Sequence, residues 1–491
     1  MRPTVKFLTE DLIKKIIDES VNILCTLGLQ IHNKQVLSML ADHQAKVDMD
    51  KCHVNLTEEI IQKAIKTAPP SFKLYDVKGN QTHDFSDHNV YFTPGSSALN
   101  ILDCQTQQMR KPLTNDYIDF SKIIAQLKNI ASTSTAFMPT DVCEKISDSY
   151  RLFLSLLYCE KPIVTGAFTI ESFAVMKDFQ LAVRESEKAL KEKPLTIFSC
   201  CPTSPLKWCE VSSQNLIDCA RYSIPAEITT MPLAGFTAPV TLTGTLIQHT
   251  AEVLSGVVIS QLINPGTPVL LGGSPAIFDI RYETTPMGAI ETMMLDCAFN
   301  EIGKYLNLPT QAYTAMSDAK QIDAQAGLES GIGATLAALA GINNISGPGM
   351  IDFESCQSLE KLVLDNEMCG MTFRLIDGIT PRDDFPALPI FQELLREKHL
   401  LIAEHTTRYR DKEIFFPGPA IDRANRQRWK QDGAMDLEAR LQNEVKKLLK
   451  TYQPSTLPET TKKDLVKLME KEARRHGQDH LPLPERVTKA S

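Results

Sequence analysis

The chain has 491 residues and a formal net charge of −8, with 43% hydrophobic and 23% charged residues. These are ordinary values for a globular protein, and they argue against a disordered chain, a fibrous repeat and a small disulfide scaffold. The length exceeds the roughly 250 to 300 residues at which one hydrophobic core stops growing, so we expect one large domain with appendages or two domains. Residues 386–491 carry 21 Lys and Arg against 16 Asp and Glu, a net +5, so the rest of the chain carries −13. Such an acidic body argues against nucleic-acid binding.

The sequence has no segment typical of export or of a membrane span. The longest apolar runs, such as the one from Val253 to Ile263, are interrupted by Ser, Gly and Gln and fall short of about 20 apolar residues. The N-terminus has no apolar signal core. The twelve cysteines are scattered without a CxxC pair, as free thiols in a reducing compartment would be. We therefore expect a cytoplasmic protein that contacts no membrane and binds no metal through its own side chains.

Residues 1–85 are expected to form an N-terminal helical layer. Apolar residues from Leu12 to Leu27 recur on one helical face, and two further helices are predicted near 33–42 and 57–67. Pro69 and Pro70 end this part.

Residues 86–385 repeat one unit, a short β-rich run followed by a turn-rich segment and a helical pattern. Eight such runs are predicted: near Tyr91, 131–135, 163–166, 195–198, 226–229, 269–272, 309–313 and 344–346. Several are apolar without alternation, as strands covered on both faces should be. Eight units over about 290 residues favour an α/β fold of the (β/α)₈ TIM-barrel type over an open doubly wound sheet.

Residues 386–491 change character and are expected to form a C-terminal helical extension. Its amphipathic and charged helices are interpreted as packing on the outside of the barrel. The alternative is that this basic tail is a docking surface for an acidic partner.

Candidate functional residues are sought in the loops after the strands, because a barrel builds its site there. These loops lack the GxGxxG and GxxxxGK[ST] spacings of nucleotide sites and the GxSxG and HExxH motifs of hydrolases. His249 lies in a helical run and is interpreted as a core histidine. The ionisable loop candidates are Glu227, Asp279, Arg281, Glu283, Asp318, Asp323, Glu329 and Asp352. The aromatic candidates, which can face a cation, are Tyr91, Phe137, Phe236, Tyr313 and Phe353.

Six segments in order along the chain resemble the trimethylamine methyltransferase superfamily of corrinoid-protein methyltransferases. They are ILCTLGLQIHN, TAPPSFKLYD, GSSALNILDCQTQQMRKPLTNDYIDFSKI, LGGSPAIFDIRYETTPMGAIET, SDAKQIDAQAGLE and ISGPGMIDFESCQSLEKLVLDNE. The resemblance implies a (β/α)₈ barrel that moves a methyl group from a methylated amine to the Co(I) corrinoid of a partner protein.

The chain departs from the trimethylamine enzymes of that superfamily in one respect. Those enzymes use a pyrrolysine, whereas this chain contains only the twenty standard residues. The resemblance therefore points to the members that act on quaternary amines such as glycine betaine, proline betaine or carnitine. A quaternary nitrogen leaves as a neutral amine, so it needs no covalent activation before a strong nucleophile attacks its methyl carbon.

Position and residue type then suggest a set of site residues for that reaction. We expect Asp318, Tyr313 and Asp279 to be catalytic, with the aromatic ring facing the cation and the carboxylates adding charge. Further aromatic contacts to the cation and donors for a substrate carboxylate complete the set of substrate-binding candidates: Ser96, Ser97, Phe236, Arg281, Phe353 and His405.

The same interpretation implies the partners. The chain itself is expected to hold no tightly bound cofactor, because the Co(I) cobamide comes with a partner corrinoid protein, and we expect a homo-oligomer. Two alternatives remain open. One is a non-catalytic barrel that binds a small metabolite or scaffolds the corrinoid protein, and the other is a metal-dependent lyase or zinc-dependent methyltransferase, which the dispersed His and Cys disfavour.

Overall fold

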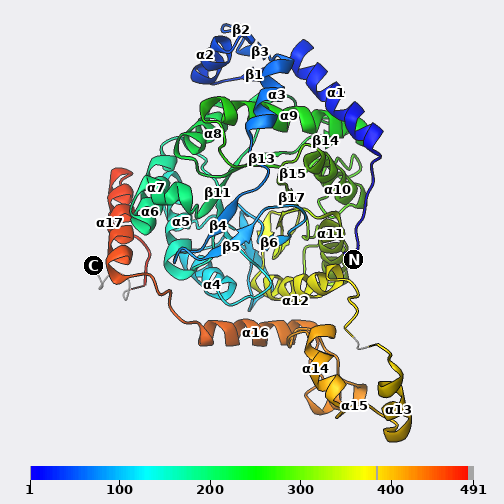
Figure 1. The fold of residues 1–491 in the computed structure, drawn as a ribbon. Coiled ribbons are helices and arrows are strands. Elements are labelled where there is room, and N and C mark those ends of the chain that lie inside the picture. The colour runs from blue at the N-terminus through cyan, green and yellow to red at the C-terminus, as the bar shows by residue number, and fades with distance from the viewer. Residues whose placement is uncertain (1, 383–384, 485–491) are drawn as a thin grey trace.

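The computed structural model describes residues 2–382 and 385–484 and has eight parallel strands at its centre (Figure 1). All eight strands expected from the sequence are present: β6 (Tyr91–Thr93), β9 (Thr133–Ser134), β10 (Ile163–Thr165), β11 (Thr196–Cys200), β13 (Ala226–Thr230), β15 (Val269–Gly273), β17 (Gln311–Tyr313) and β18 (Asn344–Ser346). Strands β10, β13 and β15 are buried along their whole length. Burial on both faces explains why their sequences are not alternating.

The eight strands follow one another in chain order in two sheets. Strands β9, β10, β11, β13 and β15 form one sheet, and β17, β18 and β6 form the other. Backbone hydrogen bonds join the sheets on both sides: for example, Leu271 N donates to Pro309 O at 2.9 Å, and Ala131 N donates to Phe92 O at 2.9 Å. The result is an α/β fold in which the strands lie inside a ring of helices (Figure 1).

Each central strand is followed by a helix of this ring: α4 (Thr114–Ile124), α5 (Ser147–Tyr158), α6 (Ser172–Arg184) with α7 (Glu187–Glu192), α8 (Glu210–Tyr222), α9 (Leu242–Ile263), α10 (Ile290–Tyr305), α11 (Ala324–Ala340) and α12 (Leu359–Ile376). Several of these helices begin after an N-cap residue whose side chain accepts hydrogen bonds from free backbone N–H groups. Asp323 caps α11 and Ser358 caps α12 in this way. Helix α9 is long and apolar enough to cross a membrane, but 78% of its apolar stretch is buried here, and the helix packs among α1, α3, α8 and α10.

The N-terminal layer is mixed rather than purely helical, which corrects the expectation for residues 1–85. It contains α1 (Glu10–Thr26), α2 (Lys34–Asp42) and α3 (Glu58–Thr67). It also contains a small sheet in the order β12 (Lys207–Trp208), β1 (Leu29–Ile31), β3 (His53–Asn55) and β2 (Lys46–Asp48). Strands of two or three residues are too short to show a period in the sequence, so the pattern missed them.

A hairpin of β4 (Lys73–Tyr75) and β5 (Gln81–Asp84) covers the N-terminal end of the strands. Its apolar side chains form one cluster with inward-facing strand residues: Phe72, Leu74, Phe85, Val164, Ile197 and Leu270. Arg184 fixes the hairpin by donating to the carbonyls of Tyr75, Asp76 and Val77 at 2.6–3.2 Å. The hairpin lies in front of the strands in Figure 1.

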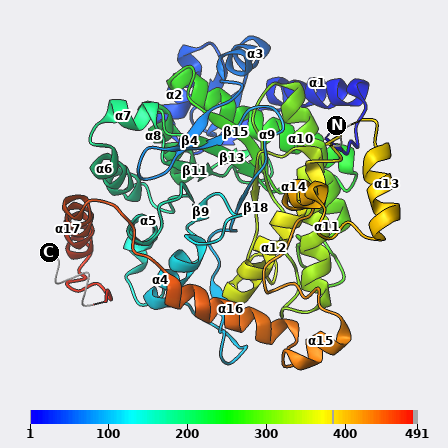
Figure 2. The same ribbon diagram turned by 60° about the horizontal axis from the view of Figure 1, so that its bottom comes forward.

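The C-terminal extension has two different parts. Helices α16 (Leu437–Thr451) and α17 (Glu459–Arg475) pack on the outside of the ring, against α4 and α12 and against α5 and α6. In contrast, α13 (Leu388–Glu397), α14 (Glu404–Glu413) and α15 (Arg426–Gln431) contain no buried residue. These three helices project from the body (Figures 1 and 2).

Candidate active site

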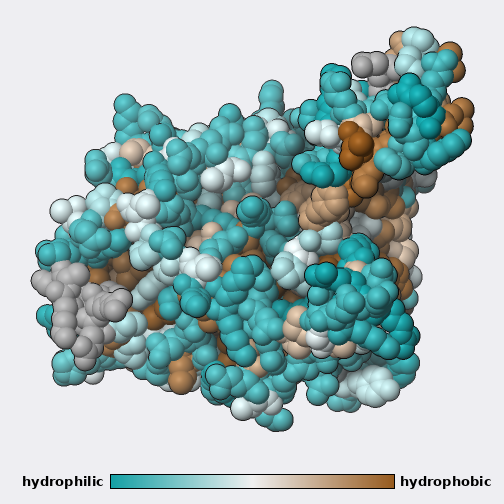
Figure 3. All heavy atoms as spheres, turned by 90° about the horizontal axis from the view of Figure 1, so that it is seen from below, coloured by the Kyte–Doolittle hydropathy of each residue, from teal (hydrophilic) through white to brown (hydrophobic). Residues whose placement is uncertain are grey.

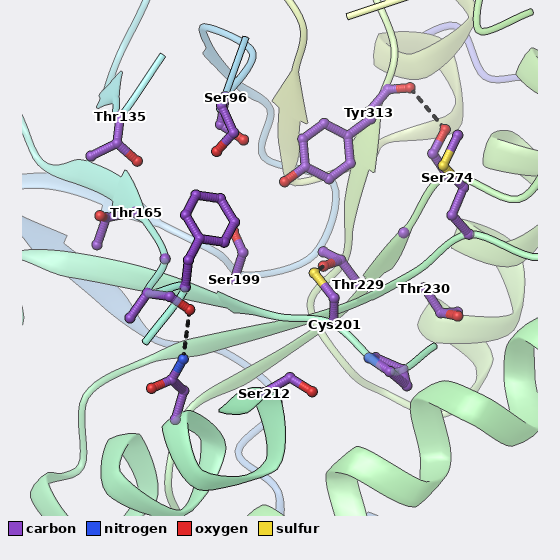
Figure 4. Close-up of a pocket in the computed structure, with 18 of the residues that line it drawn as sticks. Ser96, Thr135, Thr165, Ser199, Cys201, Ser212, Thr229, Thr230, Ser274 and Tyr313 are labelled. Atoms are coloured by element: carbon purple, nitrogen blue, oxygen red, sulfur yellow. Dashed lines mark hydrogen bonds between the residues drawn. The ribbon is translucent and has the colours of Figure 1, made fainter. Parts of the chain in front are cut away.

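A cavity of about 590 Å³ lies at the C-terminal ends of the central strands. All eight strands, or the loops that follow them, contribute lining residues. Those used in the description below are Ser96, Ser97, Thr135, Thr165, Phe168, Ser199, Cys201, Thr229, Met287, Tyr313 and Glu354. Figure 4 shows the ring of Tyr313 and the hydroxyl groups of several of these residues around one space. The size is that of a small-molecule site.

A fully buried carboxyl group, that of Glu227, lies beneath the cavity. Ser199 Oγ donates to Glu227 Oε1 at 2.5 Å and Tyr313 OH donates to the same oxygen at 3.4 Å. Asn344 Nδ2 donates to Oε2 at 3.3 Å. Because Ser199 and Tyr313 both line the cavity, they connect it to the carboxyl group below.

A second carboxyl group, that of Glu354, reaches the cavity from an unusual turn. Asp352, Phe353 and Glu354 have φ values of 52°, 55° and 69°, so three consecutive non-glycine residues are left-handed. Left-handed backbone costs an L-residue roughly 1–2 kcal/mol. Such strain is typically concentrated at functional sites. The turn brings Glu354 Oε1 within 3.4 Å of the Ser96 amide nitrogen, which donates to it.

Burial shifts the ionisation of this group of side chains. Burial raises the pKa of Glu227 to about 7, against the opposing effect of its hydrogen bonds from Ser199, Asn344 and Tyr313. Burial also raises the pKa of Glu354 to about 8. The pKa of Tyr313 is raised by burial and by the nearby Glu227. Two carboxyl groups at the base of the cavity thus change charge near neutral pH, which is typical of functional groups.

Hydroxyl and thiol groups form much of the remaining wall. The Ser97 hydroxyl accepts from Arg151 Nη1 at 3.4 Å, and Arg151 is itself fully buried and paired with Asp148 at 2.9 Å. Cys201 Sγ lies 2.8 Å from Thr229 Oγ1, and burial raises the pKa of its thiol to about 12, so the thiol stays neutral. Within the described residues, no three His, Cys, Asp or Glu side chains gather as a metal site would require.

Three of the predicted site residues line the cavity: Tyr313, Ser96 and Ser97. Tyr313 is held through its carbonyl, which accepts from Ser274 Oγ at 3.3 Å (Figure 4). The backbone amides of the two serines are not available to a substrate carboxylate. Ser96 N donates to Glu354 and Ser97 N donates to Thr135 O at 3.1 Å. Only the hydroxyl groups of these serines can therefore act on a ligand.

Asp318 lies behind the cavity wall and does not line it. Its carboxylate accepts from Met287 N and Gly288 N, both at 2.9 Å. Met287 lines the cavity, so Asp318 acts on the site by positioning that loop. Burial raises the pKa of Asp318 to about 6, although the two backbone amides oppose this shift.

Asp279, Arg281 and Phe236 lie in the loops after β13 and β15, which are called the lip here because they leave the strand ends at which the cavity lies. Arg281 pairs with Asp279 at 2.6 Å, and its hydrogen bond holds the pKa of Asp279 low, at about 2. Phe236 is 67% exposed and stacks on Phe278 with 4.7 Å between ring centres. None of the three lines the cavity, because the chain extends well beyond the strand ends in these loops.

The remaining two predicted residues lie elsewhere. The Phe353 ring is covered by Lys320 Nζ at 3.8 Å from its centre, so it faces a cation of the chain itself. His405 lies on α14 with its ring 5.0 Å from that of Tyr409, in the projecting part of the extension. The structure does not bring His405 to the cavity, because the helices of the ring end with α12 at Ile376 and His405 lies beyond them.

The sequence also contained signals that the predicted set did not use. Glu227 is a single charged residue inside the buried run Ala226–Thr230, and a charge in a strand buried on both faces is rare unless it has a role. Glu227 is among the ionisable loop candidates, but the expected set of site residues does not include it. Glu354, Ser199 and Cys201 were missed, since nothing in their local pattern distinguishes them from ordinary turn and strand residues.

Comparison with known proteins gives one family over almost the whole chain. Residues 1–477 match the family described as trimethylamine methyltransferase (MTTB). A trimethylamine methyltransferase of Desulfitobacterium hafniense (strain DSM 10664 / DCB-2) is 28% identical over 450 residues, covering 92% of this chain and 90% of that protein. A glycine betaine methyltransferase of D. hafniense (strain Y51) is 27% identical over 457 residues, covering 93% and 94%.

The fold also has a counterpart among solved structures. The crystal structure of the Methanosarcina barkeri monomethylamine methyltransferase is similar with a TM-score of 0.51 and 12% identity, covering 90% of this chain and 88% of that one. At this identity the likeness concerns the fold alone.

Proposed function

The chain belongs to the trimethylamine methyltransferase (MTTB) family, and we propose that it transfers a methyl group from a quaternary amine in the cavity to the Co(I) corrinoid of a separate protein. The observation that carries this proposal is the cavity base, where Tyr313 and the carboxyl groups of Glu354 and Glu227 lie together. An aromatic ring with ionisable carboxyl groups is a suitable site for a methylated ammonium ion. The eight strands inside their ring of helices are taken to form a closed (β/α)₈ barrel.

The reaction needs little acid–base chemistry from the protein. The electron pair of Co(I) forms the new bond to a methyl carbon, the C–N bond breaks, and its electron pair stays on nitrogen as a neutral amine departs. The positive charge, which is localised on the ammonium group in the reactants, is spread over nitrogen, methyl carbon and cobalt in the transition state, so a site poor in water favours the transition state over the solvated reactants. The residues of this chain bind the cation, orient one methyl group toward the mouth and exclude water.

Glycine betaine is the substrate that we propose first, with proline betaine and carnitine as close candidates. A relative of this chain is a glycine betaine methyltransferase. The chain has only standard residues, which suits a quaternary nitrogen that needs no covalent activation. The Ser97 hydroxyl can donate to the substrate carboxylate, because it already accepts a hydrogen bond from the buried Arg151.

The lip around the mouth supports docking of the corrinoid protein. Four large apolar or aromatic side chains in the loops after β13 and β15 are largely exposed there: Phe236, Val240, Ile280 and Tyr282. Exposed apolar side chains that cluster on a protein surface mark interaction sites. We assign this lip to the partner that brings the corrinoid.

The test mixes the purified protein with Co(I) cobalamin, or with a reduced corrinoid protein, and a panel of methylated amines. Formation of methylcobalamin, followed by its absorbance, is expected with a quaternary amine and not with trimethylamine. Tyr313→Phe and Glu354→Gln are expected to reduce the rate at least tenfold, whereas Glu187→Gln on the exposed helix α7 should not. No methyl transfer with any amine and either acceptor, together with measurable amine binding, would instead support a non-catalytic binding barrel.

A further inference from the structure

The projecting part of the C-terminal extension carries an unpartnered apolar surface. Residues 385–416, called the arm here, include α13 and α14, and neither helix has a buried residue. Leu388, Phe391 and Leu395 recur on one face of α13. Eight large apolar side chains of the arm are 53–85% exposed: Phe385, Leu388, Phe391, Leu395, Leu401, Ile402, Ile414 and Phe416. In Figure 3 several hydrophobic side chains are visible on this projection among hydrophilic ones.

The arm is firmly attached at its base. Arg374 Nε of α12 donates to Glu413 O at 2.8 Å, and Gly418 N donates to Glu367 Oε2 at 2.6 Å. A side chain at Gly370 would meet the Phe415 ring at 2.5 Å, so the close approach requires glycine there. The arm is therefore held in a defined direction rather than attached by a loose linker, and its apolar face is presented away from its own body.

A second apolar strip lies on the body beside that base. It consists of Leu328 and Ile332 on α11 and of Met371 and Leu375 on α12, which are 39–63% exposed. Each pair is spaced i, i+4, so each faces one side of its helix, and the two helices pack side by side. Hydrophobic surface is visible on the body next to the projection in Figure 3.

We propose that the arm of one chain packs on the strip of α11 and α12 of a second copy, reciprocally, so that the protein is a dimer formed by arm exchange. One chain carries both an apolar arm and an apolar strip, which is what a two-fold symmetric interface requires. Neither surface is covered by the residues that the structure describes.

The area argues for a second copy rather than a different protein on the arm alone. An apolar side chain of this size offers on the order of 100 Å², so the arm offers roughly 500 Å² at its observed exposure. A standard stable interface needs about 800 Å² from each partner. The arm alone falls short of that value. In a reciprocal exchange each chain contributes an arm and a strip. At 39–63% exposure the four side chains of the strip add roughly 200 Å² by the same measure, so each chain contributes roughly 700 Å², which lies within the range of standard interfaces.

The position of the arm also separates it from the corrinoid protein. The hairpin end of the strands faces the viewer in Figure 1, and Figures 2 and 3 turn that side upward. Helix α13 also lies higher in Figure 2 than in Figure 1, as the hairpin side does. The arm therefore extends toward the hairpin side and away from the cavity mouth. A protein docked on the lip would leave the arm free.

The experiment measures the mass of the full-length protein by light scattering. The wild type is expected at twice the chain mass of 54.7 kDa. Phe391→Asp with Leu395→Asp in the arm should give the mass of one chain, and so should Leu328→Asp with Met371→Asp in the strip. Leu27→Asp with Met49→Asp, two exposed apolar residues of the N-terminal layer, is the matched control and should keep the double mass. Circular dichroism and thermal melting confirm that each variant is folded.

Mixing the arm variant with the strip variant tests reciprocity. The mixed pair has one intact arm that faces one intact strip, so a dimer weaker than the wild type should reappear. A wild-type protein of single mass, or an arm variant that keeps the double mass, overturns the proposal. A strip variant that stays dimeric while the arm variant does not shows that the arm binds elsewhere and overturns the assignment of the strip.

Discussion

Glu354 and Glu227 bring two carboxyl groups with pKa values near neutrality to one end of a small cavity. Neither has a cationic side chain among its hydrogen-bond partners, which are an amide nitrogen, two hydroxyls and a carboxamide. A methylated ammonium ion can therefore supply the opposite charge. Its arrival favours the ionised carboxylates and lowers their pKa values.

The first prediction concerns pH. Ionised fractions of Glu227 and Glu354 rise as the pH passes about 7 and about 8, so affinity for tetramethylammonium should rise about tenfold from pH 6 to pH 9. Both pKa values lie above the ordinary value of 4.5, so their contribution to the free energy of unfolding is fully present below about pH 4.5 and is lost as the pH rises from there through 7 and 8. The double variant Glu227→Gln with Glu354→Gln should flatten both profiles. Calorimetric titration and denaturation over this pH range provide the check, and unchanged profiles in the variant would assign the pH dependence to other groups.

The second prediction separates positioning from binding at Asp318. Asp318→Ala leaves the amides of Met287 and Gly288 without acceptors, which should lower the free energy of unfolding by about 2–3 kcal/mol. Because Met287 then moves in the cavity wall, turnover should fall more than amine affinity. Asp323→Ala is the control, since it also removes acceptors from two backbone amides but only at the start of α11. Loss of turnover in the control as well would show that general destabilisation is the cause.

At the scale of single residues, part of the candidate site could be predicted from the sequence. Tyr313, Ser96 and Ser97 follow predicted strands directly, and strand ends converge in such a fold, so their placement was predictable. Asp279, Arg281 and Phe236 also follow strands, but their loops run several residues farther, to the lip. Glu354 could not be placed, because a run of left-handed residues is rare for sequences without glycine.

At the scale of elements, all eight central strands were predictable because short β-rich runs, several of them apolar, alternate regularly with turn residues and helical patterns. The short strands of the N-terminal layer were not. Their two or three residues pair with partners distant in sequence, as Gln30 does with Lys207, and local pattern carries no such information.

The turn that carries Glu354 leads to the third prediction. Phe353→Gly and Phe353→Ala both remove the ring that contacts Lys320, but only glycine adopts a φ of 55° without strain. The glycine variant should exceed the alanine variant in free energy of unfolding by about 1 kcal/mol. Chemical denaturation of the two proteins side by side measures this difference. Equal stabilities would mean that the turn relaxes when the ring is removed.

At the scale of the whole molecule, the uneven charge was predictable but its placement was not. Part of the basic C-terminal segment packs on the ring as α16 and α17, as expected for outer helices. Another part projects as the arm. Its apolar residues stand among many charged residues in the sequence, so the sequence pattern did not indicate an exposed apolar surface. Whether a helix packs on its own chain depends on the direction in which the chain leaves the body before that helix. The local hydrophobic pattern of the sequence does not encode this direction.

The hairpin that covers the N-terminal end of the strands has a kinetic consequence. With its cluster of Phe72, Leu74 and Phe85 in place, the hairpin covers the end of the strands opposite to the cavity, so we expect the cavity to be entered from its mouth. A methyl acceptor as large as a corrinoid protein, once bound at the mouth, would then block the entry and exit of the amine. The amine then has to bind before the acceptor protein, and the demethylated product leaves last, after the acceptor protein has dissociated. Steady-state analysis should therefore give a compulsory order of addition, and excess acceptor protein should inhibit by trapping the empty enzyme; random order would show a second entrance.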